Sequence, residues 1–308
     1  MLKRLYRLLP GWVREPLRRG YRRFTSLRHR TRERLRPVRV TQSDIERALR
    51  ELGIAEGDAV FFQAGMAAFG TIEGGPEAVI DALESVVGER GLIAMPAFTM
   101  SGLTVEYLRA TPVVDLRSAA SAMGAVSEAF RTSPGVVRSI HPTHSVCAWG
   151  SGAAELVAGH ERAATPFGAG TPFEKLIERG GIQVFFGTGV RPLTMYHVFE
   201  CLREVPPPIE PFLEQPMDVD VIAPDGHELT VRTLVHRPEL AVGRVDASTA
   251  VSAPIERELI DAGMKRVALG RSNVMAVGLD VMLTRFEEML PKGITMYRRK
   301  ALEEATAA

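Results

Sequence analysis

Residues 57–100 read GDAVFFQAGMAAFGTIEGGPEAVIDALESVVGERGLIAMPAFTM. The apolar run at 57–66 follows a Gly-Asp turn and predicts a buried strand. Pro76 predicts the start of a helix, and Gly88 predicts its end. A second apolar run at 91–100 predicts another buried strand. This strand–helix–strand order is typical of an α/β sheet.

The flanking sequence extends this pattern on both sides. Hydrophobic spacing predicts helices at 41–52, 123–131, 151–160, 171–180, 194–204, 251–263 and 278–290, and strands within 138–150 and at 181–190. Alternating apolar and polar residues at 216–224 and 227–236 surround Asp225-Gly226 and predict a hairpin. Residues 101–122 are interpreted as a long loop, and 261–282 as a final helical segment. We expect a central, mostly parallel sheet with helices on both faces and a smaller antiparallel hairpin element.

The composition is that of an ordinary globular protein. The 308 residues are 45% hydrophobic and 24% charged, which excludes a disordered chain, a collagen and a disulfide-stapled miniprotein. No apolar run approaches the roughly 18 residues of a membrane-spanning helix. Cys147 and Cys201 lie in unrelated surroundings, so no disulfide framework is expected. Arginines interrupt the N-terminus too often for a secretory signal, and we expect a cytoplasmic protein.

Charge divides the chain into two parts. Residues 1–40 carry 14 Lys and Arg against 2 Glu, a net charge of +12, whereas the rest carries −11. We therefore predict a basic arm at 1–40, an α/β domain at 41–295 and a tail at 296–308. The arm is consistent with packing on the acidic body or a second subunit, or with lying on an anionic membrane near a lipid-linked substrate. A basic arm is also consistent with nucleic-acid binding by phosphate neutralisation. It contains no nucleic-acid recognition module, however, so no nucleic-acid partner is expected.

General motifs exclude several kinds of chemistry. The glycines at 70–75 match neither the P-loop nor the dinucleotide fingerprint, which argues against nucleotide hydrolysis and NAD chemistry. His141 and His144 flank Pro142 and have no third ligand nearby, so no metal site is predicted. Cys201 lies four residues after His197, but a packing role in a helix is the better interpretation of this thiol.

Thr194, His197 and Glu200 form the strongest catalytic pattern. They lie in GTGVRPLTMYHVFE, where the i, i+3, i+6 spacing places them on one face of a helix that follows a buried strand. A carboxylate beside a histidine can fix its tautomer and stabilise the imidazolium. The spacing therefore indicates a general base, although a structural histidine gives the same pattern.

Several longer stretches resemble the aminoglycoside 3-N-acetyltransferase family, which differs from the GNAT acetyltransferases. They are AAFGTIEGGPEAVIDALESVVGERGLIAMPAFT (67–99), MGAVSEAFRTSPGVVRSIHPTHSVCAWG (123–150), TPFGAGTPFEKL (165–176) and GIQVFFGTGVRPLTMYHVFE (181–200), with a looser match at 261–282. The order and spacing agree from about residue 41 to 290.

The resemblance implies an acyltransferase that moves acetyl from acetyl-CoA to a primary amine of an amino sugar. Its T-x-x-H-x-x-E segment falls on Thr194, His197 and Glu200, which makes His197 the implied base. The coenzyme is expected along Ala67, Phe69, Gly70, Gly124, His141 and Ser145. No metal is implied.

One departure concerns the acceptor. Antibiotic-modifying members usually read H-x-S before the A-F-G loop, whereas this chain reads Gln63-Ala64-Gly65. The departure and the basic arm favour an acceptor from biosynthesis over an antibiotic. Alternatives remain open: a donor other than acetyl, or a non-catalytic member that binds coenzyme A or sugar and docks through its arm. The sequence does not determine whether the protein forms a homo-oligomer.

Overall fold

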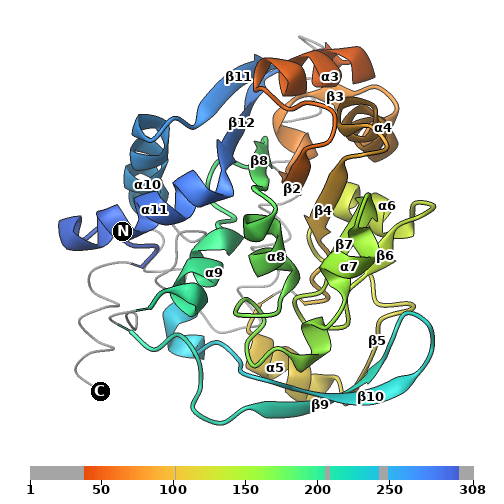
Figure 1. The fold of residues 1–308 in the computed structure, drawn as a ribbon, viewed down its shortest axis with the longest axis vertical. Coiled ribbons are helices and arrows are strands. Elements are labelled where there is room, and N and C mark those ends of the chain that lie inside the picture. The colour runs from red at the N-terminus through yellow and green to blue at the C-terminus, as the bar shows by residue number, and fades with distance from the viewer. Residues whose placement is uncertain (1–37, 101, 205–208, 243–248, 298–308) are drawn as a thin grey trace, which may run out of the picture.

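A seven-stranded sheet lies at the centre of the computed structural model, which describes residues 38–100, 102–204, 209–242 and 249–297 (Figure 1). Its strands run in the order β11 (Lys265–Leu269), β12 (Ser272–Gly278), β8 (Ile182–Phe186), β2 (Ala59–Ala64), β4 (Leu92–Pro96), β7 (Val146–Gly150) and β6 (Val137–Arg138). The central strands β8, β2 and β4 are parallel, and the flanking pairs are antiparallel. The predicted parallel sheet therefore forms the middle of a mixed sheet.

Helices cover both faces of this sheet, as predicted (Figure 1). Alternation along β2 shows the two faces, since Val60 and Phe62 belong to one apolar cluster and Phe61 to the other. The first face carries α3 (Gln42–Glu51), α4 (Gly75–Val87) and α6 (Ala125–Thr132). The second carries α7 (Ala153–Val157), α8 (Pro172–Glu178), α9 (Thr194–Leu202), α10 (Thr249–Asp261) and α11 (Leu279–Met289).

The predicted hairpin is present and belongs to a separate three-stranded sheet. Strands β9 (Met217–Ile222) and β10 (Glu228–Thr233) pair antiparallel around the Asp225-Gly226 turn. Strand β5 (Val113–Asp115) adds to β9 in parallel. Helix α5 (Thr104–Ala110) packs against this sheet through Val105 and Leu108. We call β5, β9 and β10 the small sheet; Figure 1 shows it at the lower edge of the molecule.

Two sequence interpretations were wrong. The segment 101–122 is not simply a loop, because it contains α5 and β5. The segment 261–282 is not a continuous helix, because most of it forms the edge strands β11 and β12. Leu269 pairs with Ser272 across a two-residue turn, and Gly270 adopts a φ of 53° there. A glycine tolerates this left-handed conformation, so the Gly-Arg pair was a hairpin signal.

The ends of the described chain pack into the body. Strand β1 (Arg39–Val40), at the end of the predicted arm, pairs in parallel with β3 (Thr71–Ile72). Met296 and Tyr297, the first residues of the predicted tail, are buried in the core. Residues 1–37 of the arm and 298–308 of the tail lie outside the described residues. Among the helices described, none is long and apolar enough to cross a membrane.

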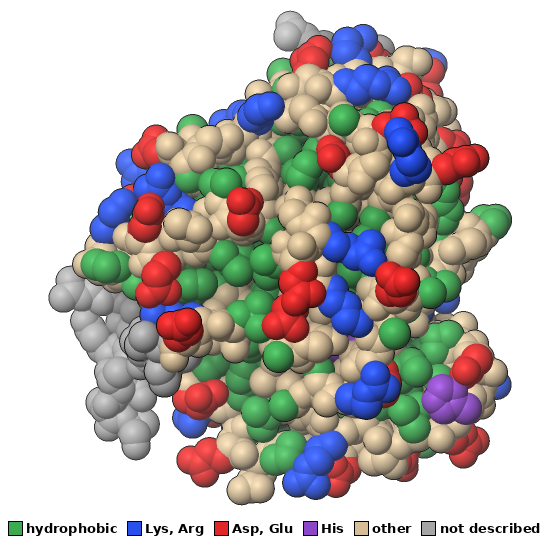
Figure 2. All heavy atoms as spheres, in the orientation of Figure 1, with side chains coloured by type: hydrophobic (Ala, Val, Ile, Leu, Met, Phe, Trp, Pro, Cys, Tyr) green, Lys and Arg blue, Asp and Glu red, His purple; other side chains and the backbone are tan. Residues whose placement is uncertain are grey.

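Short 3-10 helices complete the architecture: η1 (Met66–Ala68), η2 (His160–Arg162), η3 (Pro238–Val242) and η5 (Leu290–Lys292). On the face drawn in Figure 2, acidic and basic side chains are interspersed, with apolar side chains between them. The acidic excess of the body is therefore not gathered into a single patch on this face.

Candidate active site

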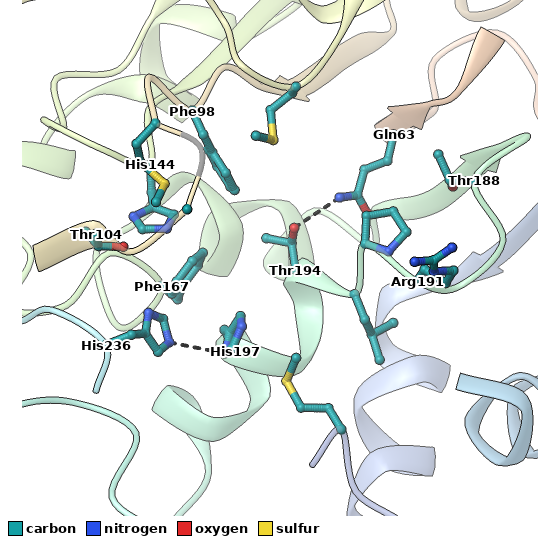
Figure 3. Close-up of a pocket in the computed structure, with 16 residues that line it drawn as sticks. Gln63, Phe98, Thr104, His144, Phe167, Thr188, Arg191, Thr194, His197 and His236 are labelled. Carbon is teal, nitrogen blue, oxygen red and sulfur yellow. Dashed lines mark hydrogen bonds between the residues drawn. The ribbon is translucent and has the colours of Figure 1, made fainter. Parts of the chain in front are cut away.

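A pocket of about 480 Å³ opens where the carboxyl ends of the central strands meet (Figure 3). Gln63 belongs to β2, Phe98 follows β4 and Thr188 follows β8. Ligands bind at this edge of open α/β sheets. The other lining residues are Met100, Gly102, Thr104, Met123, His144, Phe167, Arg191, Pro192, Leu193, Thr194, His197, His236 and Met296.

The predicted catalytic residues come together at this pocket. Helix α9 begins at Thr194, and Thr194 and His197 both line the cavity. Glu200 lies one turn further along and is 6% exposed. The Nδ1 atom of His197 donates to Oε2 of Glu200 at 2.9 Å. Since an ionised carboxylate only accepts, this bond places a proton on Nδ1 and the lone pair on Nε2.

His236 is a member of this cluster that sequence reasoning missed. It follows β10, and its Nε2 atom lies 3.2 Å from Nδ1 of His197. The His236 ring packs on Phe212, with 4.6 Å between ring centroids, and forms an isolated β-bridge with the same residue. The two histidines are 39 positions apart in the sequence. Sequence spacing could not have linked them, because His197 lies on the helix after β8 of the large sheet, whereas His236 lies after β10 of the small sheet.

Gln63 and Thr194 connect the end of β2 to the start of α9. The Nε2 atom of Gln63 donates to Oγ1 of Thr194 at 3.0 Å. Gln63 is 5% exposed, and its Oε1 atom is buried without a hydrogen-bond partner among the described residues. Figure 3 shows the two side chains pointing toward each other. This hydrogen bond fixes the Gln63 side chain beside the start of α9.

The HPTHS turn presents His144, rather than His141, to the pocket. The His144 ring packs 4.7 Å from Phe98 and 4.8 Å from Phe167, measured between ring centroids. His141 is fully buried, and its Nδ1 atom accepts hydrogen bonds from the backbone N–H groups of Thr143 and His144. Burial holds the pKa of His141 well below its ordinary value, which keeps the ring neutral and able to accept.

Ser145 supports the same turn from within the core. Its hydroxyl donates to the carbonyl of Ala97 and accepts from Nε of Arg138. Arg138 also donates to the carbonyls of Leu116 and Ala119. Ser145 and His141 thus hold the backbone that carries His144. In this structure neither lines the pocket, and their predicted coenzyme contacts stay predictions.

The remaining predicted coenzyme residues do not line the pocket. Ala67 and Phe69 lie at the turn after β2, where the Phe69 ring is fully buried 4.2 Å from Phe186, measured between centroids. Gly70 follows with a φ of 107°. Gly124 is the N-cap of α6 and directly follows Met123, which lines the pocket. The coenzyme contacts of these four residues also stay predictions.

The thiols are unsuited to nucleophilic chemistry. Burial raises the pKa of Cys201 to about 12, and it raises the pKa of Cys147 to about 12 as well. A thiol with such a pKa carries almost no thiolate at neutral pH. In the described part of the chain, no three His, Cys, Asp or Glu side chains are grouped to hold a metal ion.

Comparisons with known proteins identify the class to which this fold and site belong. A family model described as aminoglycoside 3-N-acetyltransferase matches residues 61–291. The chain is 31% identical over 277 residues to aminoglycoside N(3)-acetyltransferase VII of Streptomyces paromomycinus, a match that covers 85% of this chain and 92% of that protein. It is 35% identical over 179 residues to aminoglycoside N(3)-acetyltransferase IX of Micromonospora chalcea, covering 54% and 63%.

The chain belongs to the aminoglycoside 3-N-acetyltransferase family. The fold agrees with the crystal structure of aminoglycoside acetyltransferase AAC(3)-Xa, with a TM-score of 0.70, 25% identity, and coverage of 88% of this chain and 99% of that one. AAC-IIIb, solved as a binary complex with CoASH, gives a TM-score of 0.69 at 24% identity, covering 84% and 99%. Both the predicted family and the acyltransferase class are confirmed.

Proposed function

We propose that this chain transfers an acetyl group from acetyl-CoA to a primary amine of an amino-sugar acceptor, with His197 as general base. The observation that carries the proposal is the His197–Glu200 pair at the wall of the pocket. Coenzyme A is bound in AAC-IIIb, and AAC-VIa has been solved bound to sisomicin. Family membership supports the same donor and the same kind of acceptor here.

The chemistry requires a base because an amine is mostly an ammonium ion at neutral pH. Nε2 of His197 would remove one proton, which frees the nitrogen lone pair to attack the thioester carbonyl. The C–N bond forms, the C–S bond breaks, and the nitrogen loses a second proton as it becomes the amide. One of the two protons neutralises the departing thiolate, and the other is released to solvent. Glu200 would stabilise the imidazolium through the 2.9 Å hydrogen bond to Nδ1. A positioned base of this kind contributes about 10²–10⁴-fold in rate.

Thr194 is suited to stabilise the oxyanion that forms on the carbonyl oxygen. Its Oγ1 atom accepts from Gln63, so the Thr194 O–H proton can be directed into the pocket. A donor aimed at the developing charge is worth several kcal/mol in such sites. The backbone N–H groups near Ala67–Gly70 remain the alternative donors.

Replacing His197 by alanine tests the proposal. Thiol release from acetyl-CoA should be measured with sisomicin and D-glucosamine as acceptors, alongside the dissociation constant of coenzyme A. We expect kcat to fall by about 10²–10⁴-fold with coenzyme affinity within threefold of wild type. Unchanged turnover in His197→Ala would remove His197 as the base. Absence of turnover in wild type with every acyl-CoA and acceptor tried would favour the repurposed, non-catalytic alternative.

A role for the basic arm at a membrane is a second proposal, motivated by its net charge of +12. Liposome flotation of the full chain should be compared with a chain that starts at Val38, using vesicles with and without anionic lipid. The full chain should float more strongly with anionic vesicles, because each basic residue near the surface contributes about 1 kcal/mol to the free energy of membrane binding. Equal partitioning of both chains would contradict a membrane role.

A further inference from the structure

Three apolar side chains line a part of the pocket that is separate from the proposed base: Phe98, Met100 and Met123. We call them the apolar wall. Each keeps accessible surface, because Phe98 is 9% exposed, Met100 is 8% exposed and Met123 is only partly buried. Figure 3 shows Phe98 away from His197, with Thr194 at an intermediate position. A group bound near Thr194 can therefore reach the apolar wall.

Hydrogen bonds hold the backbone that carries this wall. The Ala122 N–H donates to the Phe98 carbonyl at 2.7 Å, which joins the segment before α6 to the segment after β4. The Thr99 N–H donates to the Thr143 carbonyl at 3.1 Å, which joins the second of these segments to the HPTHS turn. A methionine side chain has three rotatable bonds and adapts to groups of different shape. The apolar wall thus has a fixed backbone and two adaptable side chains.

The proposed reaction determines which group meets the apolar wall. Attack of the amine gives a tetrahedral carbon that bears an oxyanion, the nitrogen, the sulfur of coenzyme A and the acyl chain. In the proposed function, Thr194 faces the oxyanion and His197 faces the nitrogen, and both side chains come from α9 and line the pocket. The sulfur and the acyl chain, which are the less polar substituents, therefore point away from α9. An apolar wall on the far side of Thr194 suits them.

We infer that the apolar wall is a subsite for the acyl group of the donor, and that the chain transfers straight-chain acyl groups longer than acetyl as well as acetyl itself. Each methylene that leaves water for this wall is worth about fourfold in affinity. The inference rests on the proposed function and widens its donor. As with acetyl, the C–N bond forms, the C–S bond breaks, and the nitrogen loses two protons, one to the thiolate and one to solvent.

An apolar substituent on the acceptor is the other group that could meet the apolar wall. The two assignments differ in what a substitution changes. If the wall takes the acyl group, a Met123 variant changes the relative use of donors and leaves the relative use of acceptors unchanged. If it takes part of the acceptor, the reverse holds. Octyl β-D-glucosaminide and D-glucosamine differ by one hydrocarbon chain, so they serve as the acceptor pair.

The test uses acetyl-, propionyl-, butyryl- and hexanoyl-CoA with D-glucosamine, and it measures both kcat/KM and the dissociation constant of each donor. In wild type, we expect butyryl-CoA to bind about tenfold tighter than acetyl-CoA, since it buries two more methylenes. Met123→Trp fills the subsite and should lower the butyryl-to-acetyl ratio by about tenfold, whereas Met123→Ala widens it and should raise the hexanoyl-to-butyryl ratio by about threefold. Met217→Trp and Met217→Ala are the matched controls, because Met217 is also partly buried but lies on β9 outside the lining. Both ratios should stay within about twofold of wild type in these controls.

Damage to the fold lowers the use of every donor alike, so opposite shifts in the two Met123 variants identify the acyl group as the occupant. Tighter binding and faster use of acetyl-CoA than of butyryl-CoA in wild type, or ratios unchanged in both Met123 variants, would overturn the inference. So would a shift in the acceptor ratio of the Met123 variants without one in their donor ratios. Absence of turnover with every donor would count against the proposed function alone, and the dissociation constants would then decide the subsite.

Discussion

The Nε2 atom of His236 lies 3.2 Å from Nδ1 of His197, the same ring nitrogen that bonds to Glu200 at 2.9 Å. The His197 ring also stacks on Phe167, with 5.3 Å between centroids and 27° between planes. Glu200 comes from the same helix, whereas His236 comes from the connection after the small sheet. The imidazole therefore has two polar neighbours at Nδ1 and an aromatic ring against one face.

The shared nitrogen leads to a prediction about Glu200 and His236. Glu200→Gln and His236→Phe should each lower kcat, by about 10- to 100-fold, because each loosens the same imidazole. The double variant should lose clearly less than the product of the two single losses, since residues that act on one group are not additive. Steady-state kinetics with matched thermal melts and coenzyme affinities measure this. Independent, multiplicative losses would show that the two contacts do not act on one ring.

Stability should depend on pH through His160. Burial lowers the pKa of His160 to about 4, against 6.5 for an exposed histidine. Between these values the unfolded chain binds a proton that the folded chain does not, so the free energy of unfolding falls as the pH falls from about 6.5 to 4. The full effect is about 3 kcal/mol.

Urea unfolding at several pH values measures the slope of the free energy of unfolding against pH. His160→Gln should be less stable than wild type at pH 7.5, because His160 bonds to Ser139 and the Pro166 carbonyl, but its stability should decline less on acidification. A His160→Gln slope equal to wild type would contradict the assignment.

The Cys201 thiol should be dispensable for turnover. Since burial raises its pKa to about 12, the native thiol should react with iodoacetamide at pH 8 far more slowly than in the urea-unfolded chain. Cys201→Ala should keep kcat within about threefold of wild type, since Cys201 does not line the pocket. A loss comparable to that of His197→Ala would make Cys201 part of the chemistry after all.

Gly187 should be intolerant of any side chain. A Cβ atom there would lie 2.5 Å from Cε2 of Phe69 and 2.8 Å from the Gly65 carbonyl oxygen, at a φ of 71°. Gly180 is the matched control, because its φ is 64° and a Cβ would meet nothing within 4 Å. Gly180→Ala should cost about 1–2 kcal/mol from backbone conformation alone. Gly187→Ala should lower the free energy of unfolding clearly more than Gly180→Ala does, and it should weaken acceptor binding. Equal urea midpoints for the two variants would show that the clash relaxes.

The regular elements could be predicted where one local signal was sufficient. The Pro76–Gly88 limits of a helix and the Asp225-Gly226 hairpin both follow from residues within a few positions of one another. The antiparallel flanks of the large sheet could not be predicted in this way. The direction of an edge strand depends on where a long connection returns, which local spacing does not contain.

The same distinction holds for the pocket. Thr194, His197 and Glu200 share one helix, so the helical period fixes their relative positions. In the HPTHS turn, both histidines were visible in the sequence, but the turn's backbone decides that His144 faces the cavity and His141 the core. His236 gave no usable signal, because its approach depends on how the small sheet docks.

His236 lies in the connection that leaves the small sheet, so the way this sheet docks on the body sets the position of one neighbour of the His197 imidazole. Insertions or deletions in β9 or β10 that shift this connection would therefore also change the surroundings of the proposed base, although neither strand lines the pocket.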